Sequence, residues 1–135
     1  MKRSLKIFCA LCLTAAIAAA AWNNRQTPAE SSILLETEAE RTAWLNLRGW
    51  QVGAVQQSQT QIPQTWKTPA GQRWLQLQHA QGLEPLRFGG KPALRCVYPV
   101  ENSAGQPLYA ELLLCEGVLV GAQVYNAETQ IMQSL

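Results

Sequence analysis

Few side chains in this chain could take part in catalysis or bind a metal ion. Among its 135 residues, His79 is the only histidine, aspartate is absent, and all nine acidic residues are glutamates. Metal sites require His, Cys or carboxylate side chains grouped at short spacing, and no Cys-x-x-Cys motif follows the N-terminal segment. We therefore expect no metal, no cofactor and no catalytic residue, and a non-enzymatic function.

Glu111 and His79 are the residues on which an enzymatic alternative depends. Glu111 is the one carboxylate embedded among apolar residues, where burial would raise its pKa. A lone strand carboxylate more often forms a salt bridge with a neighbour such as Arg95, and a small envelope hydrolase that uses Glu111 or His79 is the alternative function. Cys96 and Cys115 lie in apolar runs, where a thiol packs and its pKa is raised. Whether they form a disulfide is left open.

Tryptophan and glutamine are the side chains best suited to binding a ligand. Trp44 and Trp74 fall within predicted helices and are expected in the core, whereas Trp50 and Trp66 lie outside them. Stacking on Trp50 or Trp66, together with amide hydrogen bonds, would suit a neutral glycan or an extended peptide. The basic residues are scattered, whereas nucleic acid requires a clustered basic stripe. We therefore expect no nucleic-acid partner.

Residues 1–22 have the pattern of an export signal or a membrane anchor. A short basic head is followed by an apolar run and small residues, and the run is slightly shorter than the ~20 residues that span a bilayer. Whether the segment is cleaved is left open, and in either case the rest of the chain lies outside the cytoplasm. We predict a secreted or single-pass membrane-anchored protein, with a linker at 23–35 and one domain at 36–135.

Two helices are predicted at the start of the domain. The first begins after Thr37, because Thr37 and Glu40 have the spacing of a capping box, and it ends before Gly49; an upstream extension through residues 33–35 is left open. The second runs from Pro69 to Gln81, after an extended segment that ends at Pro63. The side chains expected to face inward are Ala39, Ala43, Trp44 and Leu47 in the first helix, and Ala70, Trp74 and Leu77 in the second.

Three strands are predicted to follow, at residues 93–100, 108–115 and 118–125. Glu116-Gly117 is interpreted as a two-residue hairpin turn, which pairs Cys115 with Val118, Leu113 with Val120 and Glu111 with Ala122. Because these strands are apolar on both faces, both helices, and the C-terminal tail as a short helix, should cover the sheet. The predicted fold is α+β, with two helices on a three- to four-stranded antiparallel sheet that ends in a β-meander.

The order of these parts resembles the domain-of-unknown-function 4830 family, small exported domains of anaerobic Gram-positive bacteria. The segments that carry the resemblance are RTAWLNLRGWQV, TQIPQTW and LYAELLLCEGVLVGAQVY; Cys115 stands where the family usually has an aromatic residue. The resemblance implies a membrane-tethered or secreted α+β domain and supplies no activity. We predict a binding or accessory domain of the cell envelope, with a membrane-linked sensor as a further alternative.

Overall fold

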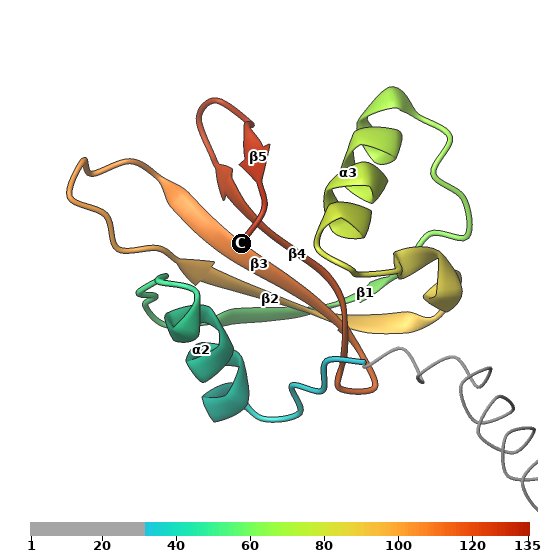
Figure 1. The fold of residues 1–135 in the computed structure, drawn as a ribbon, viewed down its shortest axis with the longest axis horizontal. Coiled ribbons are helices and arrows are strands. Elements are labelled where there is room, and N and C mark those ends of the chain that lie inside the picture. The colour runs from blue at the N-terminus through green and yellow to red at the C-terminus, as the bar shows by residue number, and fades with distance from the viewer. Residues whose placement is uncertain (1–31) are drawn as a thin grey trace, which may run out of the picture. The chain divides into compact units, whose positions relative to one another are not determined.

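A five-stranded antiparallel sheet is the centre of the fold. The computed structural model describes residues 32–135, so the prediction for residues 1–22 and most of the predicted linker lie outside the described residues. The strand order is β1-β2-β3-β4-β5 (Figure 1), with bounds β1 Gln56–Gln61, β2 Pro92–Pro99, β3 Leu108–Cys115, β4 Val118–Asn126 and β5 Met132–Gln133. Two α-helices, α2 (Glu38–Leu47) and α3 (Pro69–Ala80), accompany it. The α+β class is confirmed, with a larger sheet than predicted.

Helix α2 begins where the sequence predicts, but it turns a different face to the sheet. The Thr37 hydroxyl accepts from the Glu40 backbone at 3.2 Å, and the Glu40 carboxylate accepts from the Thr37 backbone at 2.9 Å. Arg41 and Leu45 are the buried residues of the helix, and the side chain of Leu47 is 86% exposed. Of the predicted inward residues, Trp44 packs against the hydrophobic core as expected, whereas Ala39, Ala43 and Leu47 are exposed. The predicted face was therefore wrong for those three residues, and polar contacts of Glu38 and Arg41 lie where the helix meets the sheet and the preceding segment.

Residues 33–35 form an extended segment and no helical turn. Leu34 bridges to Val118, the Leu35 backbone donates to the Gly117 carbonyl at 2.8 Å, and the Leu119 backbone donates to the Ile33 carbonyl at 2.8 Å. The structure thus answers the question that the sequence left open: residues 33–35 do not extend α2. The segment pairs with the outer side of β4.

Among the described residues, no helix is long and apolar enough to cross a membrane.

Helix α3 begins and ends close to the predicted residues, but the side chains that it buries are not the predicted ones. Its N-cap, Thr68, accepts from the Gly71 backbone at 3.0 Å, as the Thr-Pro pair predicts. The buried residues are Gly71, Leu75 and Gln78, while the predicted Trp74 and Leu77 are half-buried and Ala70 is exposed. The face is rotated because Gln78, a polar residue, bonds to the sheet.

The β3–β4 hairpin confirms the predicted turn and corrects its register. Glu116 and Gly117 have φ values of 50° and 80°, as a type I′ turn requires, and Cys115 pairs with Val118. A bulge then shifts the ladder, so that Leu113 pairs with Gly121 and Glu111 with Gln123. The predicted pairs with Val120 and Ala122 were wrong because Val120 is the additional residue of the bulge.

The C-terminal tail forms a turn and a strand where a short helix was predicted. The side-chain oxygen of Asn126 accepts from the backbones of Glu128 and Thr129 at 2.9 and 3.1 Å, and Gln130 has a φ of 62°. An asparagine side chain that bonds its own backbone in this way favours a turn over a helix. The chain therefore reverses after β4 and returns beside it as β5.

The core lies on both faces of the sheet. We call the larger cluster, which includes Leu45, Cys96 and Leu112, the major core, and the smaller one, which includes Cys115 and Val120, the minor core. Successive strand residues point to opposite faces. Cys96 and Cys115 therefore belong to different faces, and both are free thiols.

Candidate functional site

Trp50 and Trp66, the two predicted ligand-binding residues, are not brought together by the fold. Trp50 packs against the major core and Trp66 against the minor core, so they serve opposite faces of the sheet. Both rings are half-buried, and each indole Nε1 is buried without a hydrogen-bond partner among the described residues. Substituting either ring therefore removes packing as well as a stacking surface.

Trp66 is held in place by a second tryptophan. Its ring stacks on that of Trp74, with centroids 4.5 Å apart and an interplanar angle of 14°. The Trp74 indole donates to the Gln123 side chain at 2.8 Å, and a Cβ on Gly121 would lie 2.7 Å from the Trp74 ring. The stacked pair is thus tied to β4, and a ligand that stacked on Trp66 would meet only the remaining exposed part of that ring.

Glu111 and His79, the residues of the enzymatic alternative, belong to different elements, β3 and α3. The Glu111 carboxylate accepts from Arg95 Nε at 2.6 Å, which confirms the predicted salt bridge. His79 is exposed in the last turn of α3, whereas Glu111 lies in β3. Residues 32–135 also contain no group of three His, Cys or Glu side chains placed to hold a metal ion.

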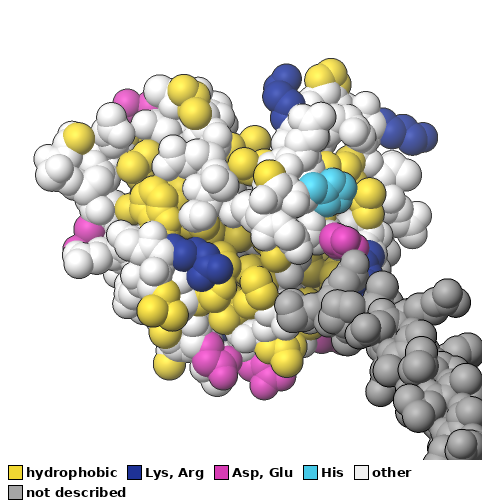
Figure 2. All heavy atoms as spheres, in the orientation of Figure 1, with side chains coloured by type: hydrophobic (Ala, Val, Ile, Leu, Met, Phe, Trp, Pro, Cys, Tyr) yellow, Lys and Arg dark blue, Asp and Glu magenta, His cyan; other side chains and the backbone are white. Residues whose placement is uncertain are grey.

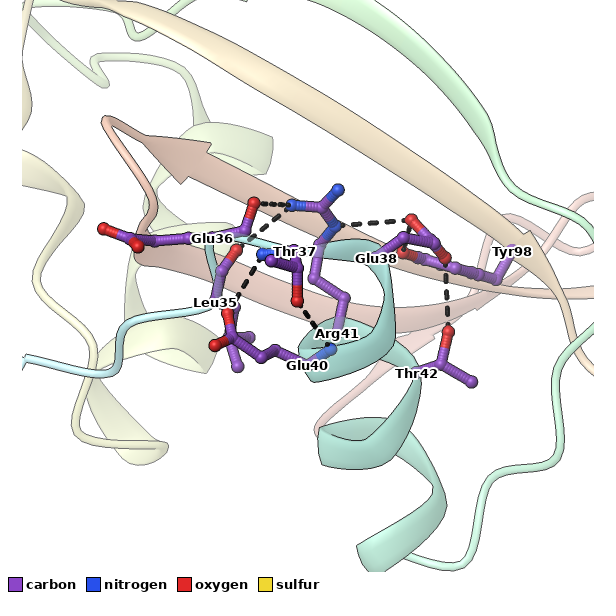
Figure 3. Close-up of polar contacts among 8 residues, drawn as sticks. All are labelled: Leu35, Glu36, Thr37, Glu38, Glu40, Arg41, Thr42 and Tyr98. Carbon is purple, nitrogen blue, oxygen red and sulfur yellow. Dashed lines mark hydrogen bonds and ion pairs between the residues drawn. The ribbon is translucent and has the colours of Figure 1, made fainter.

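The N-terminal turn of α2 holds the densest group of polar side chains (Figure 3). The Arg41 guanidinium, whose residue is 6% exposed, donates to the carbonyls of Leu35 and Glu36 at 3.1 and 3.2 Å. Its Nε lies 3.4 Å from the Glu38 carboxylate, which also accepts from the Tyr98 hydroxyl at 3.1 Å. Arg41 therefore joins the segment before α2, the helix itself and, through Glu38, strand β2.

The surroundings of this polar group do not favour the ionised, nucleophilic forms of Cys96 and Tyr98. Burial raises the pKa of the Cys96 thiol, and burial together with the hydrogen bond to Glu38 raises the pKa of the Tyr98 phenol. A thiol reacts as its thiolate, so a raised pKa makes Cys96 less reactive near neutral pH.

A pocket of about 250 Å³ lies beside Arg41 and reaches Gln59, the middle of β1.

The outer edge of β4 is covered along its length. Residues 33–35 pair with its beginning and β5 with its end. Between them, α3 supplies two amide side chains: Gln78 Oε1 accepts from the Ala122 backbone at 2.7 Å, and Gln81 Nε2 donates to the Ala122 carbonyl at 2.8 Å. These side chains take the place of a neighbouring strand, because they satisfy both backbone groups of Ala122.

The opposite edge, β1, is open within the part of the chain that the structure describes. All six of its residues are exposed, and none is charged or apolar. The Ile62 backbone donates to Lys91 and accepts from Gly90, at 2.9 and 2.7 Å, so Ile62 directs its backbone toward β2. Antiparallel ladders alternate, and the residues that direct N–H and C=O away from β2 are therefore Gln57, Gln59 and Gln61. We call these outward backbone groups the β1 edge.

Charges of both signs lie beside the β1 edge, because Glu36, Arg41 and Glu116 line the pocket that Gln59 also lines. Figure 2 shows one face of the molecule, on which apolar side chains gather in the middle and charged side chains lie toward the outside. Arg95, which pairs with Ser58 in the β1–β2 register, is neutralised by Glu111. A free strand edge is a template for pairing with another chain, and here the partner need carry no charge.

Sequence reasoning identified residues 50–63 as extended but missed that part of them forms an open edge. The missed signal is composition: QQSQTQ contains no apolar residue, so it could not be a central strand of a sheet covered on both faces. No protein-family model matches this chain, and the search of curated proteins and that of solved structures gave no significant match.

Proposed function

We propose that residues 33–135 form a non-enzymatic binding module that accepts an extended, neutral peptide strand on the β1 edge. The observation that carries the proposal is the contrast between the outer side of β4 and the outer side of β1. The fold covers β4 with a backbone segment, two glutamine side chains and β5, and it leaves the backbone groups of β1 open. Adding a strand to such an edge is a common mode of peptide recognition.

The chemistry of β1 specifies the class of ligand. Its amide and hydroxyl side chains offer donors and acceptors without charge, so they favour a polar, neutral strand over an acidic or basic one. On one face, side chains of an added strand would lie near the pocket beside Gln59 and Arg41. The signal or anchor pattern of residues 1–22 supports an extracytoplasmic location for this binding.

The stacking role of Trp50 and Trp66 stands as a separate prediction. Their indole nitrogens are buried and unpartnered within the described part of the chain, so their exposed ring edges are available only to a ligand that does not need those donors. The hydrolase alternative would require Glu111 to leave Arg95, because the 2.6 Å contact holds the carboxylate as an ion-pair partner.

A test uses short synthetic peptides that differ only in their backbone donors. Neutral peptides rich in Gln, Ser and Thr, each also made with N-methyl groups at alternate residues, are titrated into the full chain and followed by fluorescence anisotropy. We expect binding that is lost on N-methylation of the set facing β1 and retained on methylation of the other set. Affinity should be similar in low and high salt, because screening acts on charges.

Two variants at one position provide the matched control. Gln59→Pro removes an outward N–H that β2 does not use, and an edge strand tolerates proline; Gln59→Thr keeps the N–H and suits a strand. We expect the proline variant to lose binding and the threonine variant to retain it, with similar melting temperatures. If both variants bind alike, or if no peptide of the set binds at about 1 mM, the proposal is overturned.

A further inference from the structure

The β1 strand is nearly symmetric about Gln59. Reading outward from that residue, Ser58 is matched by Thr60, and Gln57 by Gln61. In the register with β2, the three glutamines lie opposite Cys96, Leu94 and Pro92, and the two hydroxyl residues lie opposite Arg95 and Ala93. The glutamines therefore share one face of the sheet and the hydroxyl residues share the other.

We propose that the strand accepted by the β1 edge is β1 of a second copy of this chain, antiparallel and with a two-fold axis at Gln59. This inference rests on the proposed function, because it names the partner of the same edge. In an antiparallel ladder, outward residues must pair with outward residues. Only the register centred on Gln59 engages all three, as Gln57 with Gln61 of the copy, Gln59 with Gln59, and Gln61 with Gln57.

The side-chain pairs of this register are complementary. Three Gln–Gln pairs form on one face, and Ser58 pairs with Thr60 of the copy, twice, on the other. Cross-strand pairs of Thr with Ser stabilise a sheet, and no pair brings like charges together. Pro63, which has no backbone N–H, falls at the next outward position and ends the ladder.

The shape of the edge admits a second copy. Every residue of β1 is exposed, and the described helix that shares a pocket with Gln59 is α2, through Arg41. The two five-stranded sheets would join into one continuous sheet with β1 at its centre. A six-residue edge buries less than the ~1,200 Å² of a standard interface, so we expect a weak dimer whose population depends on protein concentration.

Cysteine cross-linking in the full chain tests the register directly. In a chain carrying Cys9→Ser and Cys12→Ser, Gln59→Cys places two thiols at a pair with Cα atoms about 5.5 Å apart, within the range of a disulfide. Gln61→Cys is the matched control, because four residue steps of ~3.4 Å separate it from its own copy. We expect mild oxidation to give roughly tenfold more disulfide-linked dimer for Gln59→Cys than for Gln61→Cys.

Sedimentation of the reduced chain supplies the second measurement. The wild type and Gln59→Thr should show a concentration-dependent dimer, and Gln59→Pro should sediment as a monomer. Equal cross-linking at both positions, preferential cross-linking of Ser58→Cys, or a monomer at all concentrations would each overturn the proposal. Peptide binding that persists in a strictly monomeric wild type would leave the proposed function standing while removing the second copy as the partner, so the two failures are distinguishable.

Discussion

The Tyr98 hydroxyl connects strand β2 to helix α2 through Glu38. Ionisation of this hydroxyl should lower the stability of the protein at alkaline pH. Burial, followed by the hydrogen bond to Glu38, raises the pKa of Tyr98 above the ordinary value of 10.0. The folded state therefore keeps the phenol proton to a higher pH than the unfolded state does. The contribution of Tyr98 is fully present below about pH 10 and is lost as pH rises further. We expect the free energy of unfolding to fall above this pH.

The variant Tyr98→Phe isolates that contribution. It should cost about 1 kcal/mol near neutral pH, because Glu38 loses a donor, and it should flatten the alkaline decline measured by urea unfolding. The decline will not vanish, since burial also raises the pKa of Cys96 and of Tyr125. Tyr125→Phe, at a half-buried position, is the control and should flatten it less. An unchanged slope in Tyr98→Phe would contradict this account.

Gln78 has a buried side chain that bonds to the backbone of β4 where a neighbouring strand would otherwise do so. It is 0% exposed, accepts from the Ala122 backbone at 2.7 Å and donates to Gln123 at 3.0 Å. Gln78→Ala leaves a buried N–H without a partner, which should lower the free energy of unfolding by about 2 kcal/mol. It should also speed hydrogen exchange at the Ala122 amide. Gln76→Ala, an exposed change on the same helix, should stay within about 0.5 kcal/mol of the wild type.

At the scale of elements, substitutions at the two adjacent residues of the β3–β4 turn should change stability in opposite directions. Glu116 has a φ of 50°, which favours Asn or Gly, so Glu116→Asn should stabilise the protein by about 0.5 kcal/mol. Gly117 has a φ of 80°, and a Cβ there would lie 2.8 Å from Glu36. Gly117→Val should therefore cost more than the ~1 kcal/mol of an ordinary glycine replacement. Thermal melts of both variants check the signs; a neutral Gly117→Val would contradict the turn.

The elements show which structural features are legible in a single sequence. The capping box at Thr37, the Thr-Pro start of α3 and the Glu-Gly turn were predicted because each depends on residues within four positions. The rotation of α2 and the bulge in β4 were not. The rotation of α2 goes with a hydrogen bond between Tyr98 and Glu38, which are distant in sequence. The bulge brings Gly121 opposite Leu113, a pairing that the apolar pattern of the two strands does not specify.

The candidate site follows the same division. The polar composition of residues 56–61 could have been interpreted as an edge strand, because composition is local. The covering of the opposite edge by Gln78 and Gln81 could not, since it requires α3 to lie beside Ala122. The open backbone groups of β1 indicate a binding surface only when they are compared with the covered outer side of β4. A sequence can thus indicate a strand, whereas its edge becomes a binding surface only in the assembled sheet.

At the scale of the whole molecule, the structure places the start of the folded unit at Ile33, within the predicted linker. Leu35 is 5% exposed in the major core, and its carbonyl accepts from Arg41 at 3.1 Å. The backbones of Ile33 and Leu35 also occupy the outer edge of β4. Residues 33–35 therefore act as an additional edge element of the sheet, and their loss would uncover both a core side chain and a strand edge.

A pair of fragments that differ by these three residues tests the boundary. The fragment 33–135 should be soluble and should unfold cooperatively in urea. The fragment 36–135 should lose roughly 3 kcal/mol, because burial of one leucine contributes about 2 kcal/mol and Arg41 is left with an unsatisfied buried donor. Leu35→Ala in the longer fragment separates the two causes, since it removes the side chain and keeps the carbonyl; its loss should be smaller. Equal stability of the two fragments would return residues 33–35 to the linker, and a longer fragment that does not fold would show that the unit needs residues before Ile33.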